Sequence, residues 1–280
     1  MKKFVLSLCI AAIALGGCRN RQNGTATVQS TGTHAGHVWV DLGLSVKWAA
    51  CNVGADSPEQ YGDYFAWGET ERKDSYDWYS LKYCHVFSSL NFTKYITKTE
   101  TEMTPEDSAW LADEEVYFDL IPVAGDSAVP VLPALPTRKN GYTIVNFSVT
   151  ENAYEIDGRT VLDPSDDAAR ASWGGSWRMP TVDDWNELLR NCSWNWTTVN
   201  GISGHMGTSR LNGNTIFLPA AGYRDGTELR EEGRYGIFWS SNLDSLMPWK
   251  AWGIYSYHKA VGPATDGRQY GHSVRAVCVP

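Results

Sequence analysis

The sequence lacks several features that would place it in a familiar functional class. Beyond residue 15, no apolar run approaches the roughly 20 residues that a membrane-spanning helix requires. Basic residues are in the minority, with 24 Lys and Arg against 32 Asp and Glu. We therefore expect no nucleic-acid partner, because phosphate binding requires clustered Lys and Arg side chains.

Short catalytic motifs are missing as well. The chain has no G-x-S-x-G, no P-loop, no G-x-G-x-x-G that opens a helix and no H-E-x-x-H. Its six histidines are scattered along the sequence. His34 and His37 stand in a polar stretch and are expected to be solvated. Ser176 has no recognisable base beside it, so we expect it to serve in packing.

The first 17 residues have the pattern of a bacterial lipoprotein signal peptide. Lys2 and Lys3 precede an apolar run over residues 4–15, and the segment closes on Leu-Gly-Gly-Cys18, which resembles a lipobox. Diacylation of Cys18 would anchor the protein in the outer membrane of the cell envelope, on either its periplasmic or its surface-facing side. A secretory signal without lipidation is the alternative. Residues 18–37 are polar and predict a flexible tether.

Four cysteines remain after the signal peptide and Cys18 are set aside. In an oxidising envelope they predict up to two disulfides, with three pairings open. Zinc is the alternative, but none of the four stands at C-x-x-C spacing. The candidates are Cys51, Cys84, Cys192 and Cys278.

Aromatic residues and glycine are abundant, with 13 Trp, 14 Tyr and 26 Gly. This composition predicts short strands, tight turns and an aromatic core. A period-two pattern then marks half-buried strands interrupted by a turn at Gly43. The residues that share one parity in this pattern are Val38, Val40, Leu42, Leu44, Val46 and Trp48.

Two short helices are predicted in the second half of the chain. Thr181 follows Met179-Pro180 and can cap a helix whose first turn carries Asp183 and Asp184. Val182, Trp185, Leu188 and Leu189 recur at helical spacing and give that helix one apolar face. An earlier helix is expected to begin at Asp163-Pro164, and we interpret the nearby aspartates as capping residues.

Residues 96–158 predict a β-rich insertion. The segment begins acidic, continues with four prolines and then contains Asn140-Gly141, a strong hairpin signal. It could hold the specificity of this protein or be a decorative insertion, and the residues leave both alternatives open.

The run W-R-M-P-T-V-D-D-W-N-E-L at residues 177–188 resembles a signature of the Fibrobacter succinogenes major paralogous domain and of related Bacteroidetes lipoprotein domains. A similar run occurs in formylglycine-generating enzymes. Further matches stand in the expected order at residues 48–55, 61–69, 217–224, 235–241 and 271–277. The resemblance implies an α+β, C-type-lectin-like fold over residues 38–280, with short antiparallel strands, two short helices and long loops.

Three functions follow from this resemblance. The first is a non-catalytic binding or adhesion module that engages a glycan or a protein through the loops of the domain. The second is a metalloenzyme of the formylglycine-generating or oxygenase type, but the copper-binding cysteine pair of those enzymes is reduced here to Cys278. The third is a structural envelope protein. We predict no cofactor; calcium would have to bind without the E-P-N, Q-P-D or W-N-D motifs of calcium-dependent lectins.

The late loops of lectin-like folds form the binding surface, which here implies residues 242–250 and 258–269. We expect Trp249, Asp244, Asp266 and Arg268 to form an exposed ligand-binding rim there. Arg178 and Arg275 lie in apolar motifs, and we expect them to make structural ion pairs.

Overall fold

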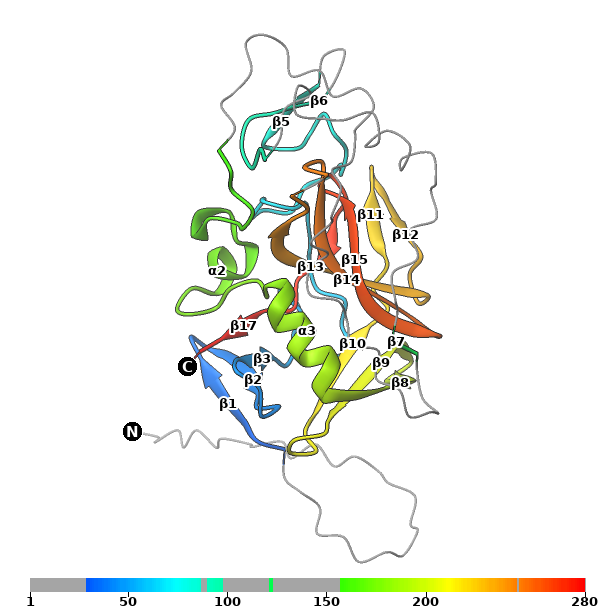
Figure 1. Ribbon diagram of the computed structural model, residues 1–280. Coiled ribbons are helices and arrows are strands. Elements are labelled where there is room, and N and C mark those ends of the chain that lie inside the picture. Colours follow the sequence, from blue (N-terminus) through cyan, green and yellow to red (C-terminus); the bar gives the residue numbers. More distant parts are fainter. Residues whose placement is uncertain (1–28, 87–89, 98–120, 123–156, 246, 280) are drawn as a thin grey trace, which may run out of the picture.

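The computed structural model describes residues 29–86, 90–97, 121–122, 157–245 and 247–279 (Figure 1). This part of the chain is mostly β-structure with two short α-helices, which confirms the α+β class at that level and identifies no specific fold. The helical segments are η2 (Pro164–Asp166), α2 (Ala168–Trp173) and α3 (Val182–Asn191). The strands are β1 (Thr31–His34), β2 (His37–Val40), β3 (Lys47–Ala49), β4 (Tyr64–Phe65), β5 (Cys84–Val86), β6 (Leu90–Phe92), β7 (Ile121–Pro122), β8 (Cys192–Val199), β9 (Ile202–Ser209), β10 (Thr215–Pro219), β11 (Tyr223–Asp225), β12 (Glu228–Arg230), β13 (Tyr235–Leu243), β14 (Lys250–Tyr257), β15 (Ala260–Gly267), β16 (His272–Ser273) and β17 (Val277–Cys278).

The largest sheet has six strands in the order β4-β16-β13-β14-β15-β7. Its centre is an antiparallel meander in which β14 pairs with β15 over eight residue pairs, from Lys250↔Gly267 to Tyr257↔Ala260. His258 and Lys259 form the turn between them. The prediction of a loop over residues 258–269 is therefore wrong for most of these residues. Most of this segment is strand instead, because β15 pairs with β14 along its whole length and with the edge strand β7 at Ala260 and Val261.

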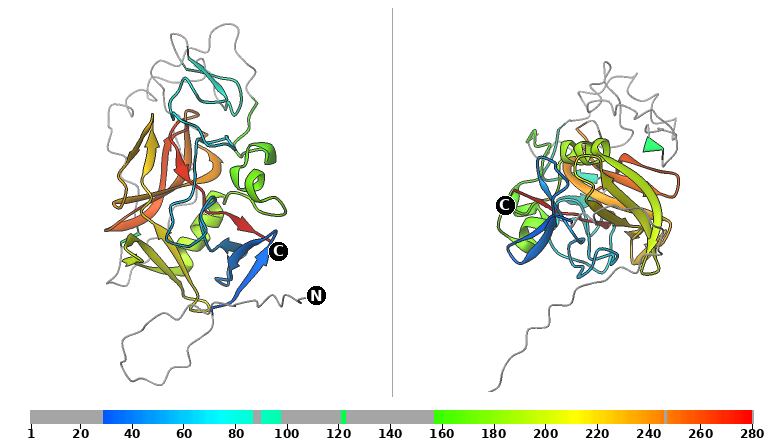
Figure 2. Two further views of the ribbon diagram at one scale, coloured as in Figure 1. Left: turned by 180° about the vertical axis from the view of Figure 1, so that it is seen from behind. Right: turned by 90° about the horizontal axis from the view of Figure 1, so that it is seen from below.

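The first and last described strands meet in a second sheet, ordered β1-β2-β3-β17. It lies at the opposite end of the molecule from the β5–β6 hairpin (Figures 1 and 2). Residues 31–37, expected to be tether, instead form a hairpin with Thr31↔Val40 and His34↔His37 in register. Backbone pairing orders this polar segment without an apolar side chain. The indole Nε1 of Trp177 also donates to the carbonyl of His34 at 2.9 Å.

Helix α3 confirms the predicted cap and apolar face. Thr181 Oγ1 accepts from the backbone N–H of Asp184 at 3.1 Å, and the backbone N–H of Thr181 donates to Asp184 Oδ2 at 2.7 Å. This reciprocal pair is a capping box. Trp185 enters the core beside Trp48, with ring centroids 4.6 Å apart. The helix contacts β13, β14 and β15 of the largest sheet and also β8.

Tryptophan and aliphatic side chains fill the interior, as the composition predicts. One cluster lies under α3 and a second surrounds Trp67, Trp177 and Trp239. A third contains Tyr64, Tyr76 and Leu81 near the β11–β12 hairpin. The alternation predicted from Val38 to Trp48 is confirmed for burial at Val40, Leu42, Leu44, Val46 and Trp48, whereas Val38 is 46% exposed. Only its ends are strand, in β2 and β3, and residues 41–46 between them are not.

The structure contains no disulfide among Cys51, Cys84, Cys192 and Cys278, and the expected disulfides stay a prediction. Cys192, Cys278 and Cys84 belong to three separate core clusters, while Cys51 is half-buried at the surface. Burial raises the pKa of Cys192 to about 12 and that of Cys278 to about 11. Both side chains therefore behave as small apolar groups.

Most of the predicted insertion at residues 96–158, including the Asn140-Gly141 hairpin, lies outside the described residues. Its described strand β7 pairs with the edge of β15 through Val261↔Ile121. Among the described helices, none is long and apolar enough to cross a membrane.

Candidate functional site

The predicted ligand-binding rim is not formed as expected. Arg268 and Asp244 are 0% and 3% exposed. The guanidinium of Arg268 lies between the rings of Trp67 and Phe92, at 5.0 and 4.7 Å from their centroids, and donates to the carbonyl of Pro248 at 3.1 Å. Burial lowers its pKa to about 10. Arg268 is a packing residue, because its fork of donors satisfies several loop carbonyls at once.

The other two rim residues are also separated from a common surface. Trp249 is half-buried and packs against the third core cluster. Asp266 lies at the end of β15, where its Oδ2 is 3.3 Å from Nε2 of the buried His272. The four residues therefore do not line one exposed rim.

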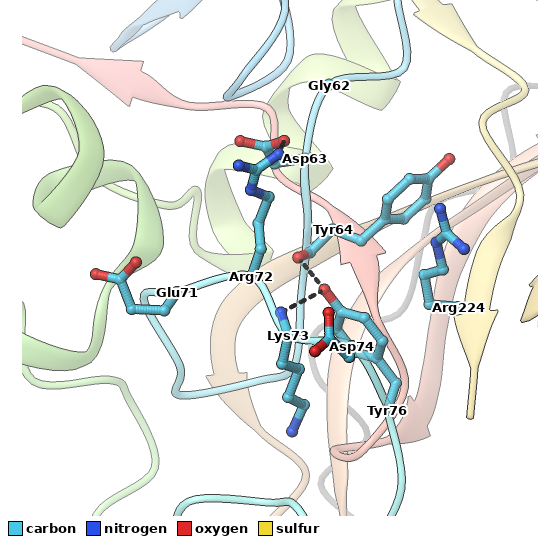
Figure 3. Close-up of a pocket in the computed structure, with 9 residues that line it drawn as sticks. All are labelled: Gly62, Asp63, Tyr64, Glu71, Arg72, Lys73, Asp74, Tyr76 and Arg224. Atoms are coloured by element: carbon cyan, nitrogen blue, oxygen red, sulfur yellow. Dashed lines mark hydrogen bonds and ion pairs between the residues drawn. The ribbon is translucent and has the colours of Figure 1, made fainter. Parts of the chain in front are cut away.

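The described structure instead has a pocket of about 620 Å³ between the 62–76 segment and strand β11 (Figure 3). The pocket is predominantly polar, and its lining combines acidic, basic and tyrosine side chains. The lining residues are Gly62, Asp63, Tyr64, Glu71, Arg72, Lys73, Asp74, Tyr76 and Arg224.

Two tyrosines give this pocket a fixed wall. Tyr64 and Tyr76 are 8% and 3% exposed. The hydroxyl of Tyr64 donates to the carbonyl of Ala221 at 2.5 Å, and the hydroxyl of Tyr76 donates to the carbonyl of Tyr64 at 2.7 Å. Burial raises the pKa of both phenols, so both remain neutral donors. The wall is therefore held by hydrogen bonds that need no ligand.

The backbone around the wall is equally constrained. Tyr76 and Gly226 exchange two backbone hydrogen bonds, of 2.9 and 3.0 Å, which fasten the β11–β12 turn to the 62–76 segment. Gly62 has a φ of 74°, and a Cβ there would lie 2.3 Å from the carbonyl oxygen of Val53. A glycine is thus required where the chain enters the pocket.

Some of the charged side chains in the lining are already paired. Asp63 pairs with Arg72 at 3.2 Å, and Lys73 pairs with Glu69 at 3.0 Å. Lys73 also donates to the carbonyl of Ser80 at 3.1 Å. These contacts hold the loop in place.

Three other charges in the lining have no such partner. Within the described part of the chain, Glu71, Asp74 and Arg224 form no ion pair. The guanidinium of Arg224 lies over the ring of Tyr64, 5.4 Å from its centroid, and makes one long hydrogen bond of 3.4 Å to the carbonyl of Thr227. Unpaired charges beside a preformed wall can bind and orient a polar ligand.

Sequence reasoning did not single out this pocket. Its residues come from two of the matched motifs, at 61–69 and 217–224, and from residues 71–76, which follow the first motif. No spacing rule brings Arg224 to Tyr64, because the two lie 160 residues apart and meet only through the packing of β11. The two motifs are the sequence features that could have indicated this pocket, but they predicted a fold and not a binding site.

Asp166 forms a second polar cluster, and it corrects the interpretation of the paired aspartates. Asp167 does cap α2, accepting from the backbone N–H of Arg170 at 3.0 Å. Asp163 makes no side-chain cap. Asp166 is buried and binds four side chains. Its donors are Lys82 Nζ at 3.0 Å, Tyr83 OH at 2.6 Å, Lys94 Nζ at 2.5 Å and Tyr95 OH at 2.7 Å.

Ser176 has a histidine beside it, contrary to the sequence-based expectation. Its Oγ is 3.0 Å from His34 Nε2, and its backbone N–H donates to the same nitrogen at 2.9 Å. The Ser176 hydroxyl also donates to the carbonyl of Val279 at 2.7 Å. Because the backbone N–H occupies the Nε2 lone pair, the contact fastens the loop to β1 and leaves no free base for nucleophilic catalysis.

The two arginines in apolar motifs differ. Arg178 pairs with Asp184 at 2.6 Å, as expected. Arg275 makes no ion pair in the described structure; its Nε donates to Asn52 Oδ1 at 2.8 Å and its Nη1 to the carbonyl of Ala50 at 3.2 Å. That part of the prediction is wrong, because an amide and backbone carbonyls satisfy this guanidinium.

Comparison with known proteins adds no assignment: the chain matches no protein-family model, no curated protein and no solved structure. Within the ranges that the structure describes, no three His, Cys, Asp or Glu side chains are grouped so as to hold a metal ion.

Proposed function

We propose that this protein is a binding module of the bacterial cell envelope whose ligand is a glycan held in the pocket of Figure 3. The observation that carries the proposal is the combination of a rigid tyrosine wall with unpaired charged side chains. Sugar recognition relies on a few oriented polar groups and preformed shape, and this pocket supplies both.

The size and lining of the pocket favour a hydroxylated small ligand over a protein surface. Its volume of about 620 Å³ lies within the roughly 300–1,000 Å³ typical of small-molecule sites. Asp74 and Glu71 offer carboxylate oxygens that accept hydrogen bonds from hydroxyl groups. A large exposed apolar patch would instead indicate a protein-binding surface.

The proposal also includes a lipid anchor at the N-terminus and a family for the domain. The lipobox at Cys18 supports attachment to the outer membrane, with the domain facing the periplasm or the surface. The matched motifs support a C-type-lectin-like domain of the major paralogous type. The mixture of short antiparallel strands and two short helices is compatible with such a domain at the level of class.

A glycan array probed with the full-length chain in detergent tests the proposal. We expect a restricted set of glycans to bind, and Asp74→Ala to weaken their binding at least fivefold because a hydroxyl acceptor is lost. The matched control is Asp183→Ala on α3, an exposed aspartate outside the pocket, which should bind like the unmodified chain.

Two results would contradict the proposal. Stoichiometric copper or iron in the purified protein, with turnover of a thiol peptide, would support the metalloenzyme alternative. A silent array together with one stable protein partner would support the structural alternative.

A further inference from the structure

Arg224 can offer an incoming ligand a largely unused set of donors. A guanidinium carries five N–H donors in a planar fork, and the described residues satisfy one of them, through the 3.4 Å contact with Thr227. Its guanidinium carbon lies over the Tyr64 ring, 5.4 Å from the centroid, and this contact restricts the orientations of the fork. A restricted fork loses less entropy when it forms two parallel hydrogen bonds to a carboxylate.

The charges of the pocket indicate how much negative charge a ligand can bring. The lining has three acids, Asp63, Glu71 and Asp74, and three bases, Arg72, Lys73 and Arg224. Two of the bases are already paired, Arg72 with Asp63 and Lys73 with Glu69.

What remains unpaired is a single cation with two carboxylates. Because this unpaired set carries a net negative charge, an anionic group is attracted at Arg224 and repelled near Glu71 and Asp74. A single carboxylate can therefore bind at the Arg224 end, whereas a phosphate or sulfate dianion would be repelled more strongly by the two acids.

The two unpaired acids specify the rest of the ligand. Glu71 and Asp74 are exposed carboxylates that can accept hydrogen bonds, and Figure 3 shows Glu71 and Arg224 on opposite sides of the pocket. A ligand that spans them needs a carboxylate at one end and hydroxyl donors at the other. An acidic sugar has both groups on one ring, while the side chains that follow a peptide carboxylate would meet few apolar partners in this lining.

We propose, resting on the function proposed above, that the pocket selects a sugar that carries one carboxylate, of the uronic-acid class. The carboxylate binds the Arg224 fork bidentately, and ring hydroxyls donate to Asp74 and Glu71. Arg224 is then the residue that determines specificity for acidic over neutral glycans.

Calorimetry on the full-length chain in detergent tests this inference with two matched ligands. One is a galactose oligomer that carries a single galacturonic acid, and the other is the neutral galactose oligomer of equal length. We expect the acidic oligomer to bind at least tenfold more tightly. Arg224→Gln should remove that difference. Arg224→Lys keeps the charge but loses the fork, and should weaken uronate binding about tenfold.

The matched control is Arg230→Gln on the neighbouring strand, because Arg230 is already paired with Asp225 and Glu228. It should retain the preference for the acidic oligomer. Thermal unfolding of each variant verifies the fold. If Arg224→Gln is unfolded, Arg224→Lys provides the test, because both substitutions remove the guanidinium fork.

The outcomes separate the two proposals. Equal affinity for the acidic and the neutral oligomer in the unmodified chain overturns the acidic-sugar inference while glycan binding stands. An acidic preference that survives Arg224→Lys and Arg224→Gln overturns the role of Arg224. Binding of a peptide C-terminus that depends on Arg224, without binding of any sugar, overturns the ligand class and the glycan function together.

Discussion

Replacing Asp166 by asparagine should destabilise the protein through the loss of one buried charge. The side chain of Asp166 is 2% exposed. Burial alone would raise its pKa, but the hydrogen bonds from Lys94, Tyr83, Tyr95 and Lys82 outweigh burial and hold the pKa well below its usual range. These donors tie the 82–95 segment to η2, including Tyr95 at a φ of 61°.

The magnitude follows from the partners of the two carboxylate oxygens. Oδ1 accepts from Lys82 and Tyr83, and Oδ2 accepts from Lys94 and Tyr95. An asparagine has one acceptor oxygen and one NH2 group in place of the two carboxylate oxygens. In either orientation of the amide, the NH2 group therefore faces two of the four donors.

Removing one partner of a buried ion pair costs about 3–5 kcal/mol. We take the lower end, about 3 kcal/mol, because Lys82 is 47% exposed and Lys94 retains Asp163 at 2.7 Å.

Urea unfolding monitored by tryptophan fluorescence measures this loss. At pH 7 the midpoint of Asp166→Asn should fall with an unchanged m-value, and Tm should fall by about 6–12 °C for a domain of this size. The exposed Asp183→Asn on α3 serves as the control. A loss below about 1 kcal/mol at pH 7 would refute the buried-hub argument.

The pH dependence gives an independent check. Because the folded pKa of Asp166 lies below the unfolded value of about 3.9, its contribution is complete above pH 4 and is lost as the pH falls further. The unmodified chain should lose stability in this window, and Asp166→Asn should lose correspondingly less.

Three further predictions concern other sites. Thr181→Ala should lower the free energy of unfolding by about 1 kcal/mol, because the N–H of Asp184 loses its cap; chemical denaturation would show no change if the cap were irrelevant. Burial lowers the pKa of His205 to about 4, so stability should fall by about 3 kcal/mol between pH 6.5 and 4 as the unfolded chain takes up a proton; His205→Asn should flatten this slope in urea titrations. Cys18→Ala should abolish palmitate labelling and move the protein out of the detergent phase, and unchanged labelling would contradict the lipid anchor.

Local sequence signals predicted local structure well. Thr181 and Asp184 fix the start of α3 because a capping box needs groups only three residues apart. The alternation from Val40 to Trp48 predicted which side chains are buried, but only its ends are strand, because residues 41–46 have no strand pairing. The polar tether was extended too far, since β1 is ordered by backbone pairing that composition does not report.

Only the tertiary structure decided which charged residues are buried and which line a pocket. Arg268 was expected at the surface, yet it lies among aromatic rings supplied by the 67–95 segment. Asp166 looked like a capping residue, yet it binds Tyr95 from 71 positions away in the chain. Arg224 faces Tyr64 because β11 packs beside the 62–76 segment. Each environment is built by segments far apart in sequence, and burial and pairing of a charge depend on those segments rather than on its own neighbours.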